Sequence, residues 1–128
     1  MAHKDYTDVD KCNKELEKLV GKWQKILHEE SWTIQAFLAP PEAMSEPNRD
    51  GESMITLPTE TCYIRILNPV YYTGCVNDMD EEEVLVHEML HIIFAPFQPE
   101  NTESLEYTLW EQAVDRLART LVALDRRQ

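Results

Sequence analysis

The chain has few cysteines, and their spacing predicts neither a cross-link nor a metal knuckle. Its three cysteines, Cys12, Cys62 and Cys75, are an odd number, and no two of them form a Cys-x-x-Cys pair. We therefore expect no disulfide framework and no structural zinc knuckle. A cysteine without such a role usually packs as a small apolar side chain, and we expect the same here.

Long apolar runs are also missing. No stretch approaches the length of a membrane span, and the first residues, Met-Ala-His-Lys-Asp-Tyr-Thr-Asp, lack the apolar core of a signal peptide. We therefore expect a cytoplasmic protein with no membrane partner. At 128 residues the chain has the size of one domain, and we expect residues 1–128 to form a single one.

Basic residues are scarce relative to acidic ones. The 12 lysines and arginines face 24 aspartates and glutamates, which gives a formal net charge of −12 at pH 7. Such a charge repels phosphate backbones and anionic membrane surfaces. We therefore expect the partner to be neither a nucleic acid nor a membrane.

Hydrophobic periodicity predicts a small α+β fold. A first helix is expected from about Val9 to Glu29, where apolar residues recur at helical spacing. Three strands are expected at Trp32–Leu38, Met54–Leu57 and Thr61–Leu67, with a loop over residues 42–51. We expect these strands to form a small mixed or antiparallel sheet.

Two helices are expected in the last third of the chain. Asp78 or Asp80 can cap the first, which should run to about Ala95 because Pro96 follows. Thr102 can cap the second, which should run from Glu103 to about Asp125.

The segment from Val84 to Phe97 contains the candidate metal-binding and catalytic residues. Its only polar residues are His87, Glu88 and His91. Burying these groups in an apolar helix is costly unless they are paired or bind a metal. Residues four apart share one helix face, so both histidines can reach one ion, while Glu88 lies beside it. The alternative is two core histidines paired with Glu88 without a metal.

A catalytic zinc needs a third protein ligand and an open position. No histidine follows His91, so a later ligand must be a carboxylate. The candidates are Glu100, Glu103, Glu106, Glu111 and Asp115. Glu111 is favoured because it lies at the edge of the apolar arc of the last helix, although it could instead be a solvated surface residue.

The segments His87-Glu88-Met89-Leu90-His91 and Glu111-Gln-Ala-Val-Asp115 together resemble the gluzincin group of metallopeptidases, the thermolysin-like arrangement. The chain is also similar to small zincin-like proteins, some of them encoded by phages and prophages. The resemblance implies a zincin-like domain whose buried motif helix is followed by a helix with the third ligand. It implies one Zn²⁺ held by His87, His91 and Glu111, with Glu88 as general base.

The resemblance also implies that Asp115 hydrogen-bonds a ligating histidine and fixes its tautomer. Tyr107 is a candidate contact for the oxyanion or the substrate. The expected activity is zinc-dependent hydrolysis of a peptide or protein. The substrate would pair as an added strand with Thr61–Leu67, expected to be the sheet edge beside the motif helix.

A second function stays open. The chain could be a non-catalytic zinc-binding module that acts in protein–protein interaction or regulation. A solvent-reachable fourth coordination position favours the enzyme, whereas a fourth protein ligand favours the module.

Overall fold

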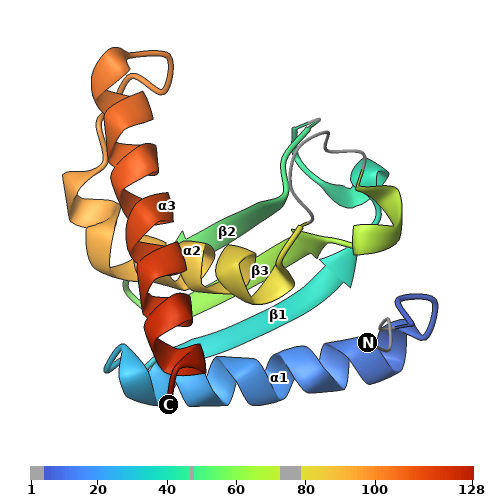
Figure 1. Ribbon diagram of the computed structural model, residues 1–128. Coiled ribbons are helices and arrows are strands. Elements are labelled where there is room, and N and C mark those ends of the chain that lie inside the picture. Colours follow the sequence, from blue (N-terminus) through green and yellow to red (C-terminus); the bar gives the residue numbers. More distant parts are fainter. Residues whose placement is uncertain (1–4, 47, 73–78) are drawn as a thin grey trace.

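Three α-helices and a three-stranded mixed sheet form the regular structure of the described residues (Figure 1). The computed structural model describes residues 5–46, 48–72 and 79–128. The expected α+β class is confirmed. The elements are α1 (Val9–Ile26), β1 (Thr33–Ala39), β2 (Gly51–Thr56), β3 (Thr61–Leu67), α2 (Glu81–Phe94) and α3 (Leu105–Arg126).

The sheet has the strand order β1-β3-β2. Strand β1 runs parallel to β3, and β2 runs antiparallel to it. The expectation that Thr61–Leu67 forms the sheet edge is therefore wrong, because β3 pairs on both sides. Its apolar residues suit this central place: Cys62, Ile64 and Ile66 are fully buried. Strands β1 and β2 are the two edges of the sheet. The outer side of β2 pairs with no strand in the described ranges.

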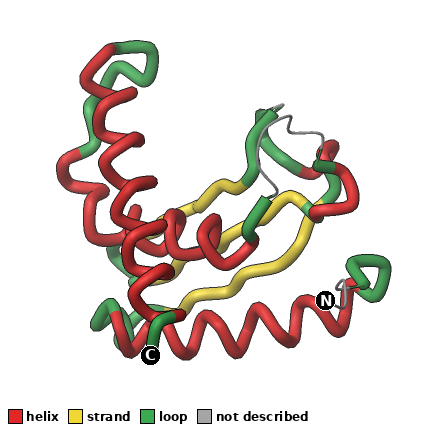
Figure 2. Tube along the Cα trace, in the orientation of Figure 1, coloured by secondary structure: helices red, strands yellow, loops and turns green. Residues whose placement is uncertain are grey.

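Helices α1 and α2 cover the same face of the sheet (Figure 2). Ile34 and Ile55 are the register partners of Cys62, so all three side chains point to this face. They meet Leu16 of α1 and Met89 of α2 in one apolar core. Cys12 and Cys62 are both buried, which confirms the expectation for these two thiols. Cys75 lies outside the described residues.

Local chemistry sets where the elements begin and end. The Asp80 carboxylate caps α2 by accepting from the backbone N–H groups of Glu82 and Glu83. The alternative cap, Asp78, lies outside the described residues. The expected Thr102 cap of the last helix is wrong: Ser104 caps α3, and its hydroxyl accepts from the Tyr107 N–H. Helix α1 ends at Ile26, before the expected Glu29, because the chain turns at His28, which has a φ of 57°.

A buried carboxylate ties the three helices together at the start of α2. The Trp23 indole N–H donates to Glu82 over 2.8 Å, and Lys22 lies 2.8 Å from the same oxygen. Arg126 approaches the other oxygen at 3.2 Å. Burial raises the pKa of Glu82, but these hydrogen bonds outweigh it and hold the pKa below its ordinary value. The first turn of α2 is thereby fixed between α1 and α3.

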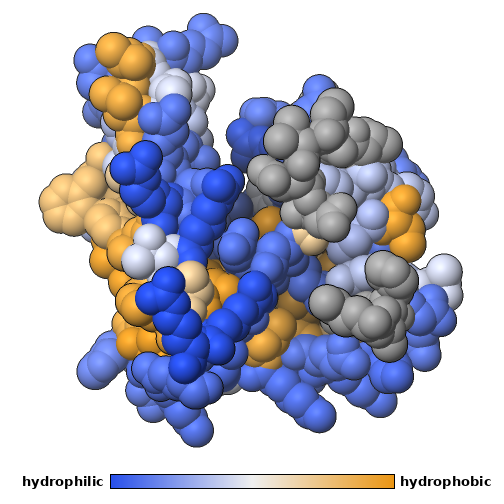
Figure 3. Space-filling view, in the orientation of Figure 1, coloured by the Kyte–Doolittle hydropathy of each residue, from blue (hydrophilic) through white to orange (hydrophobic). Residues whose placement is uncertain are grey.

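Helix α3 packs against α2, and its N-terminal half projects beyond the sheet (Figure 1). Its other end reaches α1, where Lys22 lies 2.8 Å from Asp125. Apolar side chains gather at the projecting end (Figure 3), where Leu105 is 68% and Leu109 53% exposed. Across the described ranges, neither α3 nor any other helix combines the length and apolarity that a membrane crossing requires.

Candidate metal centre

Helix α2 carries His87 and His91 side by side, and Glu88 follows His87 directly in the sequence. The ring centroids of His87 and His91 are 4.9 Å apart, as expected for residues one helical turn apart. Their side chains are 14% and 16% exposed, so each ring is largely buried but reachable. Glu88 is 5% exposed and points toward the sheet side of the helix, near Gly51.

Glu111 of α3 joins the two histidines. Its Oε1 lies 2.8 Å from His91 Nε2, and its Oε2 lies 3.4 Å from His87 Nε2. One possible ligand atom from each of these three residues lies within 4.8 Å of the others, so the group could hold a metal ion. Glu100, Glu103 and Glu106, the other glutamates considered from the sequence, are exposed and do not join this group.

Each histidine also has a partner for its other ring nitrogen. His87 Nδ1 lies 3.2 Å from Asp115 Oδ1 on α3. His91 Nδ1 lies 3.2 Å from Ser53 Oγ on β2. The Trp110 ring stacks on His91, with centroids 5.1 Å apart. Ser53 and Trp110 were not identified from the sequence, because their nearness to His91 depends on strand order and helix packing.

Glu88 places a carboxylate oxygen inside the site. Its Oε1 is buried, and His91 Nδ1 lies 3.3 Å from it as an ion-pair partner. A buried carboxylate oxygen of this kind is costly unless something else in the site uses it. This oxygen is therefore available to a water or substrate proton.

The electrostatics follow from the short contacts. Burial lowers the pKa of His91, but its hydrogen-bonding contacts with Glu111 and Glu88 and the charges of both carboxylates outweigh burial and raise the pKa to about 9. The same forces act on His87 and raise its pKa. Burial raises the pKa of Glu111, but the two histidines lower it to about 2. Glu111 is thus held as a carboxylate facing two imidazoles.

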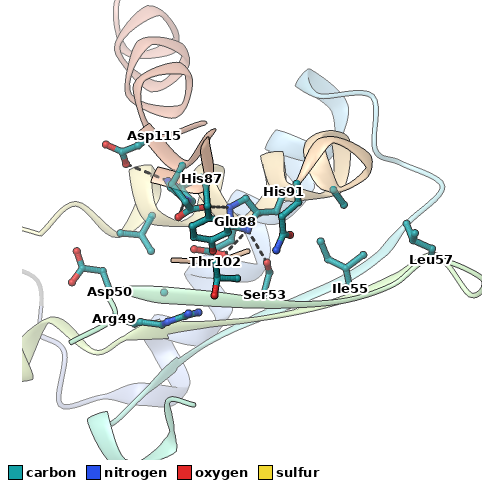
Figure 4. A pocket seen from close by; sticks show the side chains of 16 residues that line it. Arg49, Asp50, Ser53, Ile55, Leu57, His87, Glu88, His91, Thr102 and Asp115 are labelled. Atoms are coloured by element: carbon teal, nitrogen blue, oxygen red, sulfur yellow. Dashed lines mark hydrogen bonds and ion pairs between the residues drawn. The ribbon is translucent and has the colours of Figure 1, made fainter. Parts of the chain in front are cut away.

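The three residues lie on the wall of a cleft of about 690 Å³ (Figure 4). Strand β2 forms part of that wall through Gly51, Ser53 and Ile55, the alternate residues that face α2. Tyr107 of α3 also lines the cleft. Burial and the charge of Glu111 raise the pKa of the Tyr107 phenol, so this group keeps its proton near neutral pH.

The donor set fits a zinc ion. Two imidazole nitrogens and one carboxylate are the ligands of open catalytic zinc sites, and ligand bonds of about 2.0–2.1 Å place tetrahedral neighbours roughly 3.3 Å apart. The 2.8 Å and 3.4 Å contacts of Glu111 bracket that spacing. The hydrogen bonds at both Nδ1 atoms also fit, because a ligating imidazole usually donates its other N–H to a neighbour.

Two helices and one strand supply the residues of the site. His87, Glu88, His91, Glu111 and Asp115 come together from two helices, while Ser53 is supplied by the sheet. Comparison with known proteins adds no family: no family model, no curated protein and no solved structure matches this chain.

Proposed function

We propose that the chain is a zinc-dependent metallopeptidase with a minimal zincin-like domain. One observation carries this proposal: the Nε2 atoms of His87 and His91 face the two carboxylate oxygens of Glu111 on the wall of an open cleft. The resemblance to the gluzincin group rests on the same residues. Two imidazoles, one carboxylate and an open position are a donor set of catalytic zinc sites.

Each residue of the site has a separate role in the proposed hydrolysis. Zinc, when bound, supplies the Lewis acid that polarises the scissile carbonyl and activates a water molecule. Glu88, whose carboxylate lines the cleft, accepts the proton of the attacking water and passes it to the leaving amine. Asp115 and Ser53 hold the two imidazole rings through Nδ1. Tyr107 keeps its phenolic proton, and its O–H can donate a hydrogen bond to the substrate oxygen that gains charge.

The outer edge of β2, which pairs with no strand among the described residues, offers a place for the substrate. An extended peptide can add to this edge as a fourth strand, with its backbone hydrogen-bonded to β2. This position brings the peptide past Ser53 and Ile55, which line the cleft below the motif helix. The chemical class of substrate is therefore a peptide or an extended protein segment.

Two observations favour the enzyme over a non-catalytic zinc module. The described His, Cys, Asp and Glu residues contribute three members to the group, not four, so a tetrahedral ion held there would keep one position for water or substrate. The group also borders a cleft instead of being enclosed by side chains. A structural site gains nothing from a buried acceptor such as Glu88 beside its ligands.

Metal content tests the centre first. Purified protein should bind one zinc per chain, measured by mass spectrometry of the metal after dialysis. Glu111→Gln should lower the zinc content, while Glu106→Gln, the same change at an exposed position of α3, should not. A protein that takes up no zinc, or that binds it equally well as Glu111→Gln, would overturn the proposed site.

Glu88 tests the activity. Zinc-loaded protein should cleave members of a mixed peptide library, with products identified by mass spectrometry. Glu88→Gln should keep zinc but lose at least about a hundredfold in rate, since general-base catalysis contributes on that order. Glu83→Gln, on the same helix but outside the cleft, is the matched control. Cleavage that survives in Glu88→Gln would refute this role.

A further inference from the structure

The two histidines of the metal centre are supported from different parts of the fold. His87 Nδ1 meets a carboxylate, Asp115, which follows Glu111 on α3. His91 Nδ1 meets a hydroxyl, Ser53, which comes from the edge strand 38 positions earlier. The second support therefore links a ligand of the centre to the strand at the free edge of the sheet.

Strand β2 is built to approach α2 closely. A Cβ atom placed on Gly51 would lie 2.6 Å from Val84 Cγ1 and 3.4 Å from Glu88 Oε2. At Gly51 the strand contributes no side chain, so the Val84 and Glu88 side chains of the helix pack directly against its backbone. Two residues farther along, on the same face, Ser53 is small enough for this narrow gap and polar enough to reach His91.

The role of Ser53 depends on which ring nitrogen of His91 carries the proton. An imidazole that binds a metal through Nε2 carries its proton on Nδ1, and this N–H needs an acceptor. Two acceptors are within reach: Ser53 Oγ at 3.2 Å and Glu88 Oε1 at 3.3 Å. If the N–H pointed to Glu88, this hydrogen bond would stabilise the charged carboxylate and make it a weaker base toward water.

We propose that Ser53 is a positioning residue that accepts the Nδ1 proton of His91, fixes Nε2 toward the metal and leaves the Glu88 carboxylate unoccupied. This inference rests on the proposed metal centre. It adds a role for the edge strand: the strand that would bind the substrate also orients a metal ligand. The hydroxyl has a further consequence, since it can accept a proton without bringing another negative charge to the site.

The test compares zinc affinities without relying on activity. Wild-type protein, Ser53→Ala and Ser53→Thr are titrated with zinc in competition with a chromophoric chelator at fixed pH. Losing the partner of a ligating histidine typically lowers metal affinity by about 10- to 100-fold, and we expect that loss in Ser53→Ala. Ser53→Thr keeps the hydroxyl and should recover most of it. Thr56→Val removes a hydroxyl from the outward side of β2 and should bind like wild type.

A spectroscopic measurement separates positioning from general loosening of the fold. Cobalt replaces zinc, and its visible spectrum reports the geometry of the ligands. We expect Ser53→Ala to change this spectrum and Thr56→Val to leave it unchanged, with all variants showing the same far-UV circular dichroism. Equal zinc affinity and identical spectra for Ser53→Ala and wild type would overturn the role of Ser53 alone. Failure of wild type to bind zinc would overturn the metal centre and this role together.

Discussion

Glu29 offers a sharp test of how burial controls the stability of this fold. Its carboxylate is 3% exposed, and both of its oxygens are buried without a hydrogen bond to any described residue. Burial raises the pKa of Glu29 from its ordinary 4.5 to about 8. Between these two pH values the folded protein binds more protons than the unfolded chain. The free energy of unfolding should therefore fall as the pH rises from about 4.5 to about 8.

The size of the effect follows from the same two values. The interval from 4.5 to about 8 corresponds to about 5 kcal/mol when the carboxylate is fully ionised. Local relaxation and water entry reduce such costs, so we expect about 2–3 kcal/mol. Glu29→Gln removes the ionisation and should therefore be more stable than wild type by this amount at pH 8, with the difference vanishing near pH 4.5.

Urea unfolding followed by circular dichroism at several pH values between 4.5 and 8.5 measures this difference. Glu30→Gln is the matched control, because it makes the same charge change at the exposed neighbouring residue. Its unfolding curve should follow that of wild type at every pH. If Glu29→Gln shows the same pH dependence as wild type, the buried carboxylate does not carry the cost described here.

Three further measurements test other parts of the structure. Trp23→Phe removes the indole N–H that donates to Glu82 over 2.8 Å, and should lower the free energy of unfolding by about 2 kcal/mol in urea titrations. Gly51→Ala should cost roughly 1–3 kcal/mol in the same titrations, because the new methyl group meets Val84 Cγ1 at 2.6 Å, and Val84→Ala in the same chain should recover part of the loss. Burial raises the pKa of the Cys62 thiol to about 12, so iodoacetamide at pH 8 should label Cys62 only after unfolding. Peptide mass spectrometry measures the labelling, and rapid labelling of the folded protein would contradict the burial of this thiol.

Local patterns in the sequence were sufficient to predict most elements of the fold. The alternation in Thr61–Leu67 gave the bounds of β3, and apolar spacing located all three helices. Strand order was not predictable in the same way. Thr33 of β1 and Thr56 of β2 both pair with Thr61, and hydrophobic alternation alone does not say which neighbours a strand will have. The edge was therefore assigned to the wrong strand.

The candidate metal-binding residues also differ in how far the sequence predicts them. His87 and His91 are neighbours through helix geometry alone, so four residues of spacing were enough to pair them. Glu111 reaches the two histidines only because α3 packs on α2. Its place beside the apolar arc of α3 indicated this packing. Ser53 lies on a short strand whose facing side is defined only once the sheet is assembled. Its contact with His91 has no counterpart in the local sequence.

The projecting half of α3 has a consequence for how a metal could leave the site. Glu111 lies where the helix changes from its exposed first turns, with Leu105 and Leu109, to the packed turns that contain the buried Val114 and Ala118. Such turns open locally far more easily than a core segment does, and amide hydrogen exchange records that opening. Local unfolding that reaches Glu111 would withdraw one ligand while His87 and His91 stay fixed in α2. Metal exchange would then require the fraying of only about the first two turns of α3, Leu105 to Glu111, and would leave the core intact.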